Sequence, residues 1–212
     1  MLIKELCLRI KEARHVHPVH RNSIFLARYI AREGFRNILE IGTGNGAIAL
    51  YLAKKGSKVT ATDITKDSIR LVEENASLNN VKIHLVVSNL YEKIKGKYNC
   101  IIFIPPYFTF NSFSSIAFMF EKIFPVYFEV VIDSLLDRFF FNGKPSISRR
   151  KLIKKFLEGS YSHLSNNGCV FLMVFKSDIS FLKKFSFISY EEIPLPFSAA
   201  IAIFKIRYCR SP

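Results

Sequence analysis

Residues 42–46 of the chain read Gly-Thr-Gly-Asn-Gly and directly follow an apolar run. Glycine lets a backbone turn tightly and approach a ligand closely, because it has no Cβ atom. Two carboxylates accompany this loop: Glu40 lies two residues before the first glycine, and Asp63 ends the next predicted strand. A carboxylate at the end of a second strand can accept hydrogen bonds from both hydroxyls of a ribose. The spacing therefore predicts a site for a ligand that contains a nucleoside.

Two classes of cofactor fit a glycine loop of this kind. The stretch from Gly42 to Ala47 also satisfies the G-x-G-x-x-G/A pattern of dinucleotide sites, so the loop alone does not distinguish them. Three features favour S-adenosylmethionine (SAM). Glu40 can neutralise a cationic ligand but is unfavourable beside a pyrophosphate, the glycines are spaced G-x-G-x-G, and the chain closes with a strand pair instead of a second βαβ half. A tight turn that binds no ligand is the remaining alternative.

Short apolar runs that alternate with helix-like stretches must position these residues. Strands are predicted over 37–41, 58–62, 81–87, 99–104 and 169–175, and helices over 47–55, from Thr65 or Asp67 to about 78, and over 147–164. A short helix near 178–185 and a strand pair over 187–193 and 199–208 follow. This alternation indicates an α/β fold with a parallel sheet and right-handed crossovers.

The first 34 residues are predicted to form a helical extension. Apolar residues at positions 2, 6, 10 and 13 have helical spacing and predict a basic amphipathic helix over residues 2–16. A second helix over about 23–34, capped by Asn22 or Ser23, is expected to end at Gly34. We expect a single domain over residues 1–212, with this extension at 1–34 and a Rossmann-like core at 35–208.

The chain of 212 residues is strongly basic, with a formal net charge of +14 and a pI near 9.7. This excess favours polyanionic partners such as RNA, DNA or ribosomes, although lysines that only solubilise a Phe-rich protein are an alternative. One basic run can either neutralise phosphates or form an ordinary solvated face. Its members are Lys144, Arg149, Arg150, Lys151, Lys154 and Lys155.

Cysteine usage and hydropathy indicate a cytoplasmic protein. The four cysteines lack CxxC spacing, and Cys100 and Cys169 lie in apolar runs that predict core positions. Free thiols and a charged beginning of the chain are typical of the cytoplasm. The most apolar stretch, residues 116–131, is interrupted by charged residues and proline and is too short to span a membrane.

Two further features have more than one interpretation. Residues 108–141 are rich in phenylalanine, with a helix-like piece at roughly 113–137. They can form a lid, cover the core, or present a surface to a partner subunit or to a second copy of the chain. The spacing of the histidines at positions 15, 17 and 20 matches no zinc pattern, so no metal site is predicted.

The run from Glu40 to Leu50, Asp63 and the segment Ile104-Pro105-Pro106-Tyr107 together resemble the HemK/PrmC group of class I SAM-dependent methyltransferases, over roughly residues 16–208. That group methylates glutamine in translation release factors, and close relatives methylate exocyclic amines of RNA or DNA bases. The resemblance implies a seven-stranded, mostly parallel sheet whose last strand is antiparallel. It implies SAM as cofactor, and an RNA base or a translation-related protein as substrate. The residues that it assigns to the cofactor are Glu40, Gly42, Thr43, Gly44, Asn45, Gly46, Asp63, Ile64, Asn89 and Leu90, and those assigned to the substrate are Ile104, Pro105, Pro106 and Tyr107.

The chain departs from the Asn-Pro-Pro-Tyr motif of this group, because Ile104 replaces the asparagine. The asparagine oxygen and the first proline's carbonyl accept N–H groups and aim a delocalised nitrogen lone pair at the methyl group. Ile104 supplies no acceptor, so backbone carbonyls and a stacking ring at Tyr107 remain, unless that ring only packs in the core. Three explanations stay open: a different acceptor, a catalytically impaired protein that still binds SAM or RNA, or another side chain that supplies the oxygen.

Overall fold

The fold is that of a computed structural model, which describes residues 1–13, 16–106, 147–196, 198 and 201–209. Tyr107, Lys144, His15 and the Phe-rich residues 108–141 lie outside the described residues. The helix predicted at 113–137 therefore stays a prediction.

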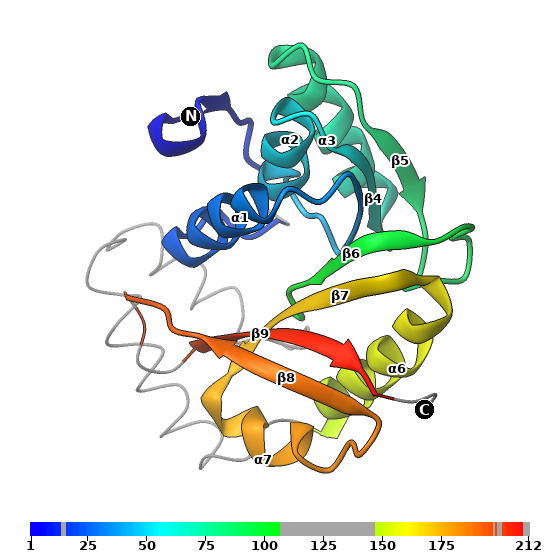
Figure 1. Cartoon of the computed structure of the whole chain (residues 1–212). Helices are drawn as coiled ribbons and strands as arrows, with labels where there is room; N and C mark the ends of the chain where they lie inside the picture. Colours follow the sequence, from blue (N-terminus) through cyan, green and yellow to red (C-terminus); the bar gives the residue numbers. More distant parts are fainter. Residues whose placement is uncertain (14–15, 107–146, 197, 199–200, 210–212) are drawn as a thin grey trace.

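One sheet of seven strands organises the described part of the chain (Figure 1). Its strands are β3 (Asn37–Ile41), β4 (Lys58–Asp63), β5 (His84–Val87), β6 (Tyr98–Phe103), β7 (Leu164–Phe175), β8 (Ile188–Ile193) and β9 (Ile201–Tyr208). They lie in the order β5-β4-β3-β6-β7-β9-β8, and β9 runs antiparallel to both β7 and β8. The predicted mostly parallel sheet with an antiparallel last strand is confirmed.

Helices cover both faces of this sheet (Figure 1). The helices are α1 (Arg21–Glu33), α2 (Ala47–Lys54), α3 (Lys66–Leu78), α6 (Ile147–His163), the 3-10 turn η3 (Lys176–Asp178) and α7 (Ile179–Leu182). Leu26 of α1 and Leu50 of α2 belong to one hydrophobic cluster, whereas Phe156 of α6 and Leu182 of α7 belong to the other. The two clusters occupy opposite faces, because neighbouring residues of a strand alternate between them.

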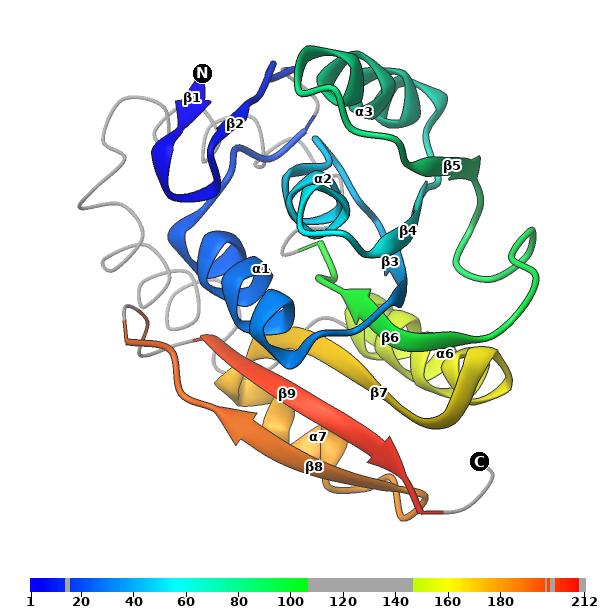
Figure 2. The ribbon, with the colours of Figure 1, turned by 45° about the horizontal axis from the view of Figure 1, so that its top comes forward.

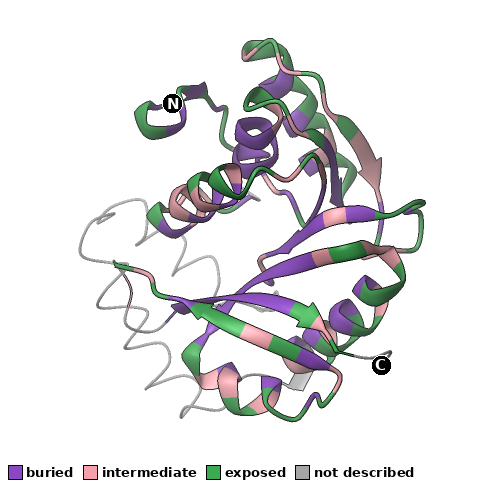
Figure 3. Cartoon of the chain, viewed as in Figure 1, coloured by how far each residue is buried: buried purple, intermediate pink, exposed green. Residues whose placement is uncertain are grey.

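The burial pattern explains why the central strands read as continuous apolar runs. Figure 3 shows long buried stretches in β6, β7 and β9, whereas β8 at the edge is buried only at its two ends. A strand with helices on both sides buries both of its faces, and an edge strand does not. Cys100 and Cys169 are register partners on β6 and β7, and both are buried as predicted.

The N-terminal helix predicted over residues 2–16 is wrong. The chain instead forms a hairpin of β1 (Leu2–Ile3) and β2 (Leu8–Arg9) around a 3-10 turn, η1 (Lys4–Leu6). Cys7 adopts a left-handed conformation with φ 53°, which ends the turn after three residues. Leu6, Leu8 and Ile10 occupy every second position and are all buried. The apolar residues in this segment therefore also fit the two-residue period of a strand. The hairpin lies beside α1 and α2 (Figure 2).

Several element boundaries differ from the prediction, among them the starts of α1, β5 and β7. Helix α1 begins at Arg21 with His20 as its N-cap, so neither Asn22 nor Ser23 caps it. Strand β5 begins at His84 instead of position 81. Strand β7 begins at Leu164, so residues 165–168, expected as a turn, lie within a strand whose register shifts against β6. In the part of the chain that the structure describes, no helix is long and apolar enough to cross a membrane.

Candidate active site

The register of the parallel strands brings the predicted residues to one edge of the sheet. Ile41 of β3 pairs with Thr62 of β4 and with Phe103 of β6. The next residues, Gly42, Asp63 and Ile104, therefore lie side by side where the three strands end. Ligands of open α/β sheets bind at this carboxyl edge. Segments separated by about sixty residues in the sequence thus form one candidate site.

The glycine loop has the backbone that only glycine adopts readily. Gly42, Gly44 and Gly46 have φ angles of 71°, 58° and 81°, all in the left-handed region. A Cβ atom on Gly46 would lie 2.7 Å from Cγ1 of Val72 on α3, closer than van der Waals contact allows. The loop therefore turns from β3 into α2 in direct contact with a neighbouring helix.

The side chain of Glu40 is buried against this loop and forms hydrogen bonds that support it. Its Oε2 accepts hydrogen bonds from the Thr43 hydroxyl at 2.7 Å and from the Ala49 backbone N–H at 3.1 Å. Burial raises the pKa of Glu40 to about 7, against the lowering effect of these two donors. The carboxylate thus satisfies an N–H group in the first turn of α2.

Asn45 occupies a second N–H group at the same end of α2, because its Oδ1 accepts from Ala47 N at 3.1 Å. A pyrophosphate bound in the dinucleotide manner would require such first-turn N–H groups. With Ala47 and Ala49 already bonded to protein oxygens, and a carboxylate at Glu40, the geometry disfavours a dinucleotide. It fits a ligand with a ribose and a cationic centre, such as SAM.

Asp63 faces the loop from the end of β4. Its Oδ2 accepts from Gly44 N at 3.1 Å, and its Oδ1 accepts from both the backbone and the hydroxyl of Thr65, at 3.0 and 3.1 Å. The Thr65 hydroxyl also caps α3 by accepting from Ser68 N. These bonds fix the carboxylate at the mouth of the loop. The predicted contact with ribose hydroxyls requires this placement and stays a prediction.

The residues predicted for the adenine side lie on the neighbouring loops. Ile64 is 67% exposed beside Asp63, which is unusual for a large apolar side chain and leaves it available to cover a flat ring. Asn89 is exposed after β5 and donates to Glu92 at 2.7 Å, and Leu90 follows with φ 47°. The Ser88 N–H donates to Asp63 O at 2.9 Å, which holds this loop against the end of β4.

The segment predicted to hold the substrate continues directly from β6. Ile104 is half-buried and packs on the hydrophobic cluster that faces α1 and α2, Pro105 is buried, and Pro106 is exposed. The Ile104 side chain is a hydrocarbon and offers no hydrogen-bond acceptor. The prolines lack N–H groups, so the polar atoms of this segment are mainly carbonyl acceptors.

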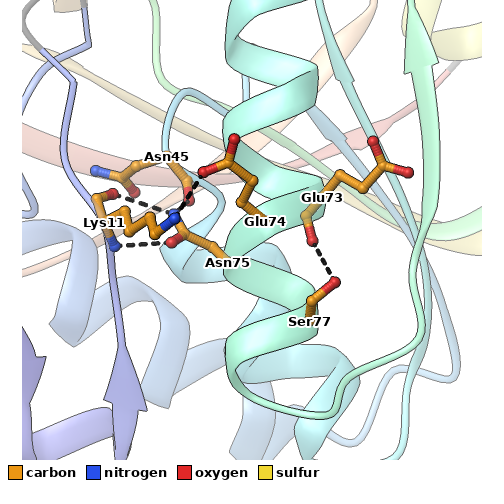
Figure 4. A network of polar contacts seen from close by, with 6 residues as sticks. All are labelled: Lys11, Asn45, Glu73, Glu74, Asn75 and Ser77. Atoms are coloured by element: carbon orange, nitrogen blue, oxygen red, sulfur yellow. Dashed lines mark hydrogen bonds and ion pairs between the residues drawn. The ribbon is translucent and has the colours of Figure 1, made fainter.

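Contacts that sequence reasoning missed join the glycine loop to the N-terminal segment. The Asn45 amide donates to His17 O at 3.1 Å, and a Cβ on Gly44 would lie 3.2 Å from the buried Val16. Asn75 of α3, fully buried, donates to Asn45 O at 3.0 Å and also bonds the backbone of Lys11 (Figure 4). Asn75 could have been recognised as important only from its burial within a helix. The sequence does not show whether a single polar residue is buried.

The basic run on α6 does not form one uniform face. Arg149 is buried, forms an ion pair with the fully buried Asp178, and lies over the ring of Phe175. Arg150 lies over the ring of Phe181. The exposed members are Lys151, Lys154 and Lys155, and Lys154 pairs with Glu158. Within the described residues, no group of His, Cys, Asp and Glu side chains could hold a metal ion.

Comparison with known proteins assigns the class of the chain. A family model described as "Methyltransferase small domain" matches residues 17–121. The fold is also that of a solved ribosomal protein L11 methylase from Lactobacillus delbrueckii subsp. bulgaricus, with a TM-score of 0.63 and 16% identity over 95% of this chain and 86% of that chain. Fold and sequence together define a SAM-dependent methyltransferase of class I.

Relatives in sequence define the family more closely. The "Putative protein N5-glutamine methyltransferase MJ0928" of Methanocaldococcus jannaschii is 31% identical over 171 residues, which cover 80% of this chain and 77% of that protein. The "Release factor glutamine methyltransferase" of Lactococcus lactis subsp. lactis is 40% identical over 76 residues, 35% of this chain and 28% of that protein. The chain belongs to the HemK/PrmC-like family of SAM-dependent methyltransferases.

Proposed function

We propose that this chain transfers the methyl group of SAM to the side-chain nitrogen of a protein glutamine held at residues 104–107. The register of β3 and β6 carries the proposal, because it sets Ile104 directly beside Gly42 of the loop that we assign to the cofactor. The similarity to a protein named as an N5-glutamine methyltransferase supports glutamine as acceptor. The chain spans under a third of the release factor methyltransferase, so the identity of the protein substrate is part of the proposal.

The reaction requires positioning more than a dedicated nucleophile. Bound SAM supplies a sulfonium-activated methyl group with its own leaving group. We assign Asp63 to the ribose hydroxyls, residues 42–46 to the close approach of the backbone, and Ile64, Asn89 and Leu90 to the adenine. The carbonyls that follow β6 accept the N–H groups of the acceptor and direct its nitrogen toward the methyl group.

Ile104 bears on the efficiency of this step. Without the asparagine oxygen, one acceptor for the amide N–H is missing, and the carbonyls of Ile104 and Pro105 must orient the nitrogen. We propose that the chain is active with these carbonyls as acceptors. The Ile104→Asn variant tests this: increased transfer would show an impaired step in the native chain, whereas loss of transfer would indicate an acceptor that suits isoleucine.

An RNA base is a second candidate acceptor, favoured by the net charge of +14 and by the exposed lysines at 151, 154 and 155. Three predictions from the sequence remain proposals. They are the partner surface at residues 108–141, the single-domain organisation and the cytoplasmic location.

Two measurements test the proposed function. Calorimetry with SAM determines whether the purified chain binds the cofactor, with NAD as the competing ligand. Transfer of tritiated methyl from SAM to total cell protein and to total RNA then identifies the class of acceptor, and digestion locates the labelled residue. Label in glutamine supports the proposal, and label in RNA alone supports the second candidate. SAM binding without transfer to either pool would favour a catalytically impaired binding protein.

A further inference from the structure

The glycine loop shares one buried amide with the N-terminal segment that follows the hairpin. Asn75 lies on α3, and its side chain is completely buried between the two segments. Its Oδ1 accepts from Lys11 N at 2.7 Å, and its Nδ2 donates to Lys11 O at 3.1 Å and to Asn45 O at 3.0 Å. Figure 4 shows Asn75 between Lys11 and Asn45.

The chemistry of these three bonds requires asparagine. A side-chain amide has two N–H donors and a carbonyl acceptor. Both N–H groups of Asn75 and its oxygen are engaged, one donor with the loop and the remaining groups with the backbone of Lys11. Aspartate has no donors, and an apolar residue would leave the Lys11 N–H, Lys11 O and Asn45 O without these partners. Orphaned buried polar groups are costly.

Asn45 is the point at which the loop receives this support. Its backbone carbonyl is held by Asn75, while its own amide donates to His17 O and its Oδ1 caps α2. Two backbone positions of the N-terminal segment are therefore linked to Asn45. Lys11 is linked through the side chain of Asn75, and His17 by a direct hydrogen bond. The peptide between Asn45 and Gly46 cannot rotate without breaking the bond to Asn75.

We propose that Asn75 is a positioning residue that couples the segment just after the N-terminal hairpin, at Lys11, to the cofactor loop, so that this segment forms part of the SAM-binding unit. The proposal rests on the placement of SAM at the glycine loop. Cofactor binding fixes the loop, the loop fixes Asn75, and Asn75 fixes the backbone at Lys11. Because SAM binds only the ordered form of the loop, the affinity for SAM depends on the fraction of molecules in which the loop is ordered.

Asn79 provides a matched control one helical turn further along α3. It accepts from Arg9 N at 2.8 Å and donates to Arg9 O at 2.7 Å, the same pair of bonds that Asn75 makes with Lys11. Its remaining side-chain bond goes to the carbonyl of Asn75, and within the described residues its side chain makes no hydrogen bond to the glycine loop. Asn79→Leu therefore releases the hairpin at Arg9, whereas Asn75→Leu releases both Lys11, just after the hairpin, and Asn45.

The test compares SAM affinity, kinetics and stability of the two full-length variants. We expect Asn75→Leu to raise the Kd and KM for SAM about tenfold or more, with kcat within about twofold of wild type, because the orphaned Asn45 carbonyl disorders the loop. Asn79→Leu should leave the Kd for SAM within about twofold, even where it lowers the Tm. Equal Kd values in the two variants would overturn the proposal.

Hydrogen exchange of the wild-type chain tests the same coupling without a variant. SAM should slow exchange of the Lys11 amide, which bonds Asn75, more than that of the Arg9 amide, which bonds Asn79. Equal slowing of both amides, or no slowing of Lys11, would overturn the coupling. If the wild-type chain binds no SAM in calorimetry, the proposed function fails first, whereas normal SAM binding with unresponsive Lys11 rejects this inference alone.

Discussion

Replacement of Gly46 by alanine tests the packing of the glycine loop most directly. The φ angle of Gly46 is 81°, and an added Cβ would lie 2.7 Å from Cγ1 and 3.0 Å from Cγ2 of Val72. Val72 is fully buried on α3 and cannot move into solvent. The variant therefore suffers both backbone strain and a steric clash in a packed interior.

The two costs can be separated with a second glycine. Gly34 ends α1 with φ 73°, and nothing lies within 4 Å of a Cβ there, so Gly34→Ala pays only for the backbone, about 1–2 kcal/mol. Gly46→Ala adds overpacking of about 1–3 kcal/mol. The sum of about 2–5 kcal/mol corresponds to a fall in Tm of about 4–20 °C for a chain of this size.

Urea unfolding followed by far-UV circular dichroism measures these losses, since the chain has no tryptophan. The double variant Gly46→Ala/Val72→Ala should lose less stability than the sum of the single variants, because the smaller residue makes room for the methyl group. If Gly46→Ala costs no more than Gly34→Ala, or if the double variant is additive, the contact between Gly46 and Val72 is not as described.

Three further predictions concern buried groups. Because burial raises the pKa of Glu40 to about 7, the folded state holds its proton more tightly than the unfolded chain, and the free energy of unfolding should fall by about 3 kcal/mol as pH rises from about 4.5 to 7. Glu40→Gln should flatten this slope in urea titrations at several pH values. Asp178→Ala should cost about 3–5 kcal/mol in the same assay by leaving the buried Arg149 charge without this partner, and a smaller loss in Arg149→Met/Asp178→Leu would confirm that cause. Gly159→Ala should destabilise, although alanine favours helices by about 1 kcal/mol, because its Cβ would lie 2.5 Å from the Tyr91 ring; a stabilised variant would contradict this packing.

Local patterns were sufficient for the core of the fold. Strands such as β3 and β6 read as apolar runs because helices bury both of their faces, and glycines and turn residues marked most of the strand ends. The hairpin at residues 2–9 was missed because Leu2, Leu6 and Ile10 fit a helical period, while Leu6, Leu8 and Ile10 also fit an alternating one. Tertiary bonds from α3 and the left-handed Cys7 decide between these periods, and neither is visible in the local sequence.

The site was predictable to the extent that strand ends determine it. Gly42, Asp63 and Ile104 could be placed together because residues that end adjacent parallel strands must meet. The sequence did not show that Glu40 turns inward to bond Thr43 and Ala49, since the same carboxylate could face a ligand. It gave no indication of Asn75, because one asparagine on a polar helix resembles its solvent-exposed neighbours.

Hydrogen bonds to other segments of the protein hold the glycine loop in its conformation. Glu40 holds it from below, Asp63 from the adjacent strand, and Asn75 and the His17 carbonyl from the N-terminal side. A loop with three left-handed glycines would otherwise sample many conformations, and a ligand would have to order it at the expense of affinity. Substitutions that never touch the cofactor should therefore weaken its binding when they remove one of these supports.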